Sequence, residues 1–99
     1  MTKFGLLATL NAKPGKEEEV EKFLRSALPM VQDEPGTVSW YAVRLGNSKF
    51  GIFDTFNDEA GRNAHLSGKV AEALFAQAAE LFSEIPKVEQ VDILAEKLP

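Results

Sequence analysis

The alternation of apolar and polar positions divides the chain into short strand-like segments and longer helix-like ones. Segments rich in apolar, β-branched and aromatic side chains predict four strands, at residues 3–11, 37–45, 49–56 and 87–95. From Lys16 to Val31, apolar side chains recur at spacings of three and four, which predicts a helix with one apolar stripe. Pro29 falls late in this stripe, so we expect a kink or an irregular last turn there.

A second helical region follows the third predicted strand. Asn57 or Asp58 can cap a helix that begins near Glu59. A longer apolar stripe then extends over residues 70–82. The Ser67-Gly68 pair weakens the region between the two, so we expect a short helix bent into a longer one.

The predicted elements follow the order β-α-β-β-α-β over residues 1–99, which we take as a single domain. Two right-handed βαβ crossovers that share a central hairpin predict a ferredoxin-like α+β fold, in which both helices cover one face of a four-stranded antiparallel sheet. The strands nevertheless carry apolar side chains on both faces. On the second strand, the two faces hold Val38 and Trp40 against Tyr41, Val43 and Leu45. Because one apolar face has no helix to cover it, we expect a homodimer through the open sheet face.

Composition narrows the classes of function. The net charge is −4 and no stretch concentrates lysine and arginine, so we expect neither a nucleic-acid surface nor a membrane anchor. The absence of cysteine excludes disulfides and cysteine-based metal sites. The chain has no phosphate-binding loop or dinucleotide fingerprint. It also has no signal-peptide pattern, so we expect a cytoplasmic protein.

His65 is the single histidine and has an unperturbed pKa near neutrality. It is a candidate general base or hydrogen-bond donor in a pocket. The alternative is a structural helix residue that satisfies a loop carbonyl near the break at Ser67-Gly68. One histidine without a clear carboxylate partner cannot supply three protein ligands, so we expect no metal site.

Asp54 shares a strand face with apolar side chains, where a carboxylate needs a partner or a raised pKa. It is therefore a candidate acid or base. The alternatives are an ion pair with Arg44 on the neighbouring strand or a helix-cap contact near Asn57.

Trp40 and Phe56 are candidate stacking surfaces for a planar aromatic ligand, although strand aromatics more often pack in the core. The apolar positions around them support either interpretation. The volume of the space between sheet and helices should distinguish a ligand site from core packing, because a filled interior leaves no room for a ring.

Four segments occur in a fixed order along the chain. They are Glu34-Pro35-Gly36 after the first helix, Trp40-Tyr41, the strand pattern Phe50-x-Ile52-x-Asp54-x-Phe56, and Asn57-Asp58-Glu59-Ala60 followed by His65-Leu66. As an ordered set, they resemble the antibiotic biosynthesis monooxygenase (ABM) family over essentially the whole chain. The resemblance implies a dimeric α+β barrel with a pocket between sheet and helices in each subunit.

The resemblance also implies a reaction, namely oxidation of a phenolic or quinol-type substrate by O2 without a cofactor. His65 or Asp54 would act as the base, and Trp40 and Phe56 would orient the substrate ring. Haem degradation, known among relatives, is disfavoured because Phe56 replaces their sheet tryptophan and Ala8 their asparagine. The alternative function is a non-catalytic dimeric module that binds a small apolar ligand or a partner protein.

Overall fold

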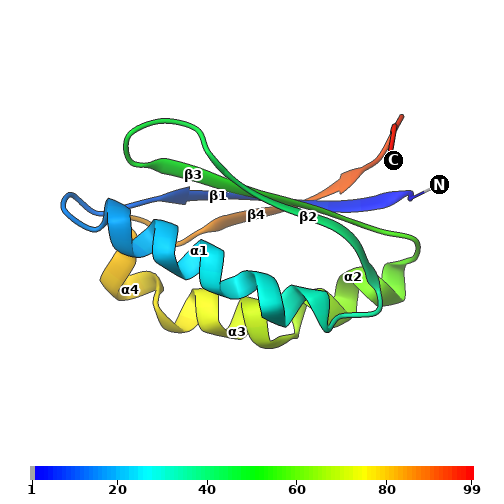
Figure 1. Ribbon diagram of the computed structural model, residues 1–99, viewed down its shortest axis with the longest axis horizontal. Helices are drawn as coiled ribbons and strands as arrows, with labels where there is room; N and C mark the ends of the chain where they lie inside the picture. Colours follow the sequence, from blue (N-terminus) through cyan, green and yellow to red (C-terminus); the bar gives the residue numbers. More distant parts are fainter. Residues whose placement is uncertain (1) are drawn as a thin grey trace.

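Four antiparallel strands form one sheet, and the helices cover one of its faces (Figure 1). The computed structural model describes residues 2–99. The strands are β1 (Phe4–Asn11), β2 (Thr37–Arg44), β3 (Lys49–Phe56) and β4 (Lys87–Asp92), in the spatial order β2-β3-β1-β4. The helices are α1 (Glu17–Gln32), α2 (Glu59–Leu66), α3 (Lys69–Ala76) and α4 (Ala78–Leu81). This arrangement is the predicted ferredoxin-like α+β fold.

The first helix has about the predicted bounds and contains Pro29 in its last turns. α1 begins with three glutamates in its first turn, where their charge opposes the positive end of the helix dipole. The helix then continues through Pro29 to Gln32 and does not end at the proline. Pro29 lies on the exposed side, where water can bind the carbonyl that loses its helical partner.

The second helical region is divided twice. Asp58 is the N-cap of α2, and its carboxylate accepts a hydrogen bond of 2.7 Å from the Gly61 amide. The expected break at Ser67-Gly68 separates α2 from α3. A further break at Gln77 separates α3 from α4, so the single helix predicted over 70–82 is wrong. The Leu81 carbonyl accepts a hydrogen bond of 2.8 Å from Lys13, which ties the end of α4 to the β1–α1 connection.

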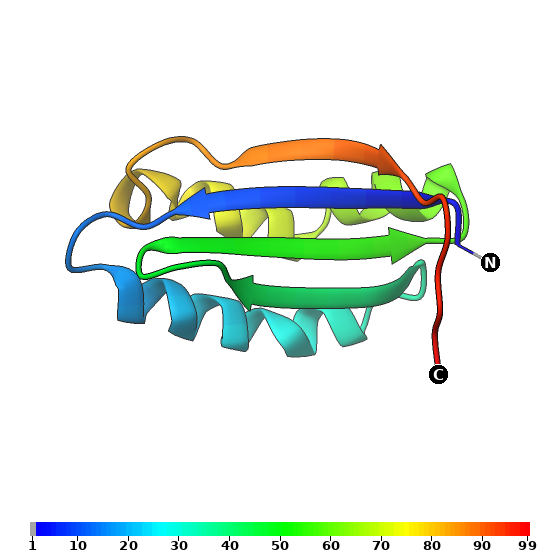
Figure 2. The ribbon, with the colours of Figure 1, turned by 90° about the horizontal axis from the view of Figure 1, so that it is seen from above.

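The last strand ends earlier than predicted, at Asp92 and not at residue 95. Beyond it the chain turns across the end of the sheet toward β2 (Figure 2). Glu96 accepts hydrogen bonds from the backbone and the side chain of Thr2, and these hold the tail in place. Sheet pairing stops because the tail changes direction at this contact.

The second strand contains an irregularity that changes one prediction. Thr37 pairs with Phe56 and Ser39 with Thr55, so Val38 is the extra residue of a β-bulge. Its side chain is exposed, whereas Trp40 faces the helices. The expectation that Val38 and Trp40 share one face is therefore wrong.

As predicted, the helices cover one apolar face of the sheet and leave the other uncovered. Alternate residues of β3, from Phe50 to Phe56, are buried against the helix layer. The opposite face leaves large apolar side chains exposed, among them Leu7 at 40%, Tyr41 at 53% and Leu45 at 59%. Within residues 2–99, none of the helices combines the length and the apolar run needed to cross a membrane.

Candidate functional site

The His65 imidazole lies between two carboxylates on the inner side of α2. Its Nδ1 atom is 2.5 Å from Glu34 Oε1, and its Nε2 atom is 2.9 Å from Asp54 Oδ2. The side chains of His65 and Asp54 are buried, and that of Glu34 is mostly buried. Both ring nitrogens are thus engaged, and no loop carbonyl serves as the partner that the structural alternative required. We refer to these three residues as the His65 cluster.

A close approach between two backbone segments brings the members of the cluster together. Asp54 comes from β3, His65 from α2 and Glu34 from the turn that joins α1 to β2. A Cβ atom added at Gly36 in that turn would lie 2.8 Å from Gly61 Cα, and one added at Gly61 would lie 2.8 Å from the Gly36 carbonyl oxygen. Because Gly61 is one helical turn before His65, this contact places Glu34 beside the imidazole.

The electrostatics of the cluster favour a protonated histidine. Burial by itself lowers the pKa of His65, but hydrogen bonds and charge attraction from Asp54 and Glu34 outweigh it and raise the pKa above 6.5. An imidazolium ion donates from both nitrogens, which matches two carboxylate acceptors. Protonation of His65 therefore places a buried positive charge between two carboxyl groups.

Glu34 is the member that sequence reasoning missed. In the sequence it belongs to a Glu-Pro-Gly turn, and 31 residues separate it from His65. Its Oε1 atom also accepts a hydrogen bond of 2.7 Å from the Thr37 hydroxyl, which fixes the carboxylate. No local pattern reports such a pairing, because it arises only when the turn packs on α2.

Asp54 keeps one carboxylate oxygen free of protein partners. Its Oδ2 atom binds His65, whereas its Oδ1 atom is buried without a hydrogen-bond partner. The alternative partner Arg44 instead pairs with Glu21 at 3.2 Å and lies over the Phe50 ring. The predicted Asp54–Arg44 ion pair is wrong, since the side chain of Arg44 belongs to the α1 side of the sheet and is half-exposed.

A small cavity adjoins the His65 cluster on the α3 side. Its volume is about 40 Å³, and its walls include Asp54, His65, Ile52, Leu74 and Val88. This space has room for one or a few water molecules or a diatomic gas, because about 10–15 Å³ of such volume is enough for one water. It does not hold an aromatic ring.

Phe56 is a buried core residue beside the His65 cluster and does not reach the surface. Its side chain is fully buried, and its ring centroid is 5.5 Å from that of His65. This packing restricts the orientation of the imidazole. A direct contact between Phe56 and a ligand is not available in this arrangement.

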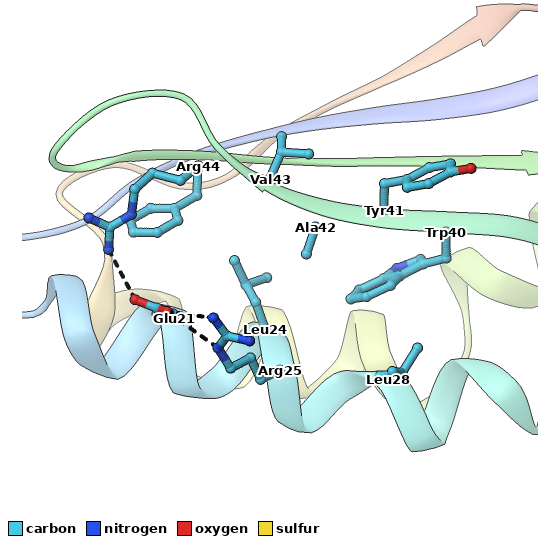
Figure 3. Close-up of a pocket in the computed structure, with 10 residues that line it drawn as sticks. Glu21, Leu24, Arg25, Leu28, Trp40, Tyr41, Ala42, Val43 and Arg44 are labelled. Atoms are coloured by element: carbon cyan, nitrogen blue, oxygen red, sulfur yellow. Dashed lines mark hydrogen bonds and ion pairs between the residues drawn. The ribbon is translucent and has the colours of Figure 1, made fainter.

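Trp40 lies on the other side, in a larger groove between α1 and β2 (Figure 3). The groove has a volume of about 490 Å³, enough for a small aromatic molecule. Its lining includes Leu24, Leu28 and Phe50, with Arg25 and Arg44 toward one end. The structure thus brings His65, Asp54 and Phe56 together, and Trp40 stands between their cluster and the groove.

The described residues hold no group of three or more His, Cys, Asp or Glu side chains arranged to bind a metal ion. In the His65 cluster, the imidazole lies between the carboxylates and binds both of them. A single ion would need all three side chains to converge on one point. The geometry of these residues fits proton sharing better than metal binding.

Comparisons with known proteins agree with this architecture. The sequence model of the antibiotic biosynthesis monooxygenase family matches residues 3–77. A protein of unknown function from Nitrosomonas europaea is 54% identical, with a TM-score of 0.97, over 100% of this chain and 96% of that chain.

Two other solved structures share the fold at lower identity. A protein from Pseudomonas aeruginosa is 24% identical over 96% of this chain and 97% of its own, with a TM-score of 0.80. A candidate antibiotic biosynthesis monooxygenase from Caulobacter crescentus is 21% identical over 95% and 92%, also with a TM-score of 0.80. Among curated proteins, none matches the chain significantly.

Proposed function

Because this chain belongs to the antibiotic biosynthesis monooxygenase family, we propose that it oxidises a small phenolic or quinol-like aromatic substrate with O2 and without a cofactor. The observation that carries the proposal is the free Oδ1 atom of Asp54. A buried carboxylate oxygen without a partner is costly, and such groups are concentrated where a protein performs chemistry.

In the proposed reaction, Asp54 is the base and His65 supports it. The raised pKa of His65 favours the protonated ring, whose nitrogens donate hydrogen bonds and do not accept the substrate proton. Asp54 Oδ1 is then the free acceptor within the cluster. Glu34 holds the imidazole in position through its contact with Nδ1.

Removal of the phenolic proton leaves an electron-rich anion that reduces O2 directly. One oxygen atom of O2 forms a bond to a ring carbon, and the other leaves as water together with the two hydrogen atoms lost by the phenol. For a simple phenol the products are one quinone and one water for each O2 consumed. The protein supplies the base, the orientation of the ring and the exclusion of water.

We place the substrate ring in the groove between α1 and β2. The groove has the volume for a ring, whereas the cavity beside His65 does not. Trp40 offers a flat aromatic wall in the groove. Phe56, our other predicted substrate contact, would act indirectly by orienting His65.

Oxygen consumption under ¹⁸O2 tests the proposal. With a panel of phenols and quinols that starts from 1-naphthol, we expect one ¹⁸O atom in each quinone formed and one O2 consumed for each quinone. Asp54→Asn should lower the protein-dependent rate on the order of 10²–10⁴-fold, the usual contribution of a general base.

Asp92→Asn is the matched control, since Asp92 is exposed at the end of β4. It should leave the rate unchanged. Uptake that equals autoxidation without protein would contradict the oxygenase proposal for this panel.

A second candidate function is a non-catalytic binding module of the same fold. The observation that favours it is the closed interior beside His65, with a cavity of only about 40 Å³ and a fully buried Phe56. Ligand binding in the groove without any ¹⁸O incorporation would support this function.

A further inference from the structure

Two buried polar atoms on neighbouring strands lack hydrogen-bond partners. They are Trp40 Nε1 on β2 and Asp54 Oδ1 on β3. Most buried polar groups in folded proteins are paired, so each unpaired one needs an explanation. The two atoms are complementary, because an indole nitrogen only donates and an ionised carboxylate only accepts.

The strand register places the two residues directly opposite each other. Trp40 pairs with Asp54 in the antiparallel β2–β3 ladder, and both side chains lie on the helix side of the sheet. The Cβ atoms of such a pair are about 4.5–5.5 Å apart. No direct hydrogen bond joins the two polar atoms, so an oxygen atom placed between these neighbouring side chains is the group that would pair with both.

The groove lies beside this position, although Asp54 itself is buried and does not line it. Trp40 forms part of its wall, and Figure 3 shows the indole between β2 and the helices, next to Ala42 and Leu28. A ring that lies against the indole with one edge turned toward β3 would bring a substituent on that edge to the side of Trp40 where Asp54 lies.

We propose that Trp40 Nε1 and Asp54 Oδ1 together bind a single hydroxyl group, the phenolic oxygen of the substrate. A hydroxyl accepts from the indole and donates to the carboxylate, so it satisfies both atoms at once. A methyl ether satisfies only the indole and leaves the carboxylate unpaired. This inference rests on the proposed function, and it assigns Trp40 a second role as the residue that selects for a free phenol.

The single tryptophan of the chain allows a direct test. In ¹⁵N-labelled protein without O2, the one indole ¹H–¹⁵N signal reports the proposed donor atom. Addition of 2-naphthol should move this signal downfield, toward a stronger hydrogen bond. We expect 2-naphthol to bind at least tenfold more tightly than 2-methoxynaphthalene, because the ether leaves a buried acceptor unpaired.

Trp40→Phe keeps an aromatic wall and removes the donor. This variant should reduce the preference for 2-naphthol over naphthalene, which has no oxygen, to less than about half of its wild-type value. Ser48→Ala is the control, since it removes one polar atom from an exposed hairpin residue that does not line the groove. It should retain the full preference.

Three results would overturn the proposal. They are equal affinity for the naphthol and its methyl ether, binding that leaves the indole signal unmoved, and no binding of 2-naphthol up to its solubility. If 2-naphthol binds without moving the indole signal, only a water molecule would lie between the two atoms.

The binding test and the oxygen test can fail independently of each other. Selective binding of 2-naphthol without ¹⁸O incorporation would leave the hydroxyl subsite standing and remove the oxygenase. Quinone formation with an unmoved indole signal would do the reverse.

Discussion

At the scale of single residues, the arrangement around His65 joins stability and chemistry in one cluster. Glu34 and Asp54 bind the two ring nitrogens, and both hydrogen bonds strengthen when the ring is protonated. The same contacts that hold the imidazole leave one oxygen of Asp54 free. A structural role for His65 and a chemical role for Asp54 are therefore compatible.

His65→Gln should lower the free energy of unfolding in a pH-dependent manner. The pKa of His65 is raised in the folded state, so its stabilisation is complete below the unfolded value of 6.5 and is lost as the pH rises through the folded pKa. We expect a loss of about 1–3 kcal/mol at pH 6 that shrinks toward pH 9, measured by urea unfolding at both values.

The chain suits this measurement because it has one histidine and no cysteine, so few other groups titrate between pH 6 and pH 9. A difference between wild type and variant that stays constant over this range would contradict a protonated His65.

At the scale of elements, the contact between the α1–β2 turn and α2 organises the site. Gly36 and Gly61 allow the two backbones to approach so closely that no side chain fits between them. Asp58 begins α2 at this point and fixes its first turn. The turn then presents Glu34 to His65, so the geometry of the cluster depends on two glycines that perform no chemistry.

Gly61→Ala should separate the turn from α2. Its new Cβ would lie 2.8 Å from the Gly36 carbonyl oxygen, and a rigid backbone atom cannot move aside easily. We expect a destabilisation of about 1–3 kcal/mol by chemical denaturation. We also expect a lower pKa of His65 by NMR titration, because Glu34 moves away from the ring.

Gly46→Ala in the hairpin loop is the control, since a Cβ there meets nothing within 4 Å. It should change the stability by less than about 1 kcal/mol. An unchanged His65 titration in Gly61→Ala would show that the glycine contact does not position Glu34.

At the scale of the whole molecule, one face of the sheet remains uncovered. Leu7, Tyr41 and Leu45 are exposed on it, and the C-terminal tail arches over one end. A hollow of about 530 Å³ lies between the tail and the sheet, with Tyr41 and Phe53 in its lining. Apolar faces of this kind mark sites of association.

We expect a homodimer that packs sheet against sheet. Sedimentation equilibrium at micromolar concentration should give twice 10.9 kDa, and high salt should not dissociate the dimer, because apolar contacts are not screened. Leu7→Lys should shift the equilibrium toward the monomer.

Ile85→Lys replaces an equally apolar side chain that is 81% exposed in the loop before β4, and it should leave the dimer intact. A wild-type protein that sediments as a monomer would contradict the interface.

The sequence by itself determined the order of the elements and the two faces of the sheet. Strand alternation placed Phe50, Ile52, Asp54 and Phe56 on one face because successive side chains of a strand point to opposite sides. The Asp58 cap and the break at Ser67-Gly68 were likewise readable, since both follow from local backbone chemistry. These are properties of neighbours along the chain.

The tertiary structure alone decided which side chains meet. Glu34 reaches His65 across 31 residues, Arg44 turns to Glu21, and Val38 becomes a bulge. Each outcome depends on how segments pack and on space that neighbouring side chains leave. The sequence singled out His65, Asp54, Phe56 and Trp40, but only packing could separate the ring-sized groove beside Trp40 from the much smaller cavity beside His65.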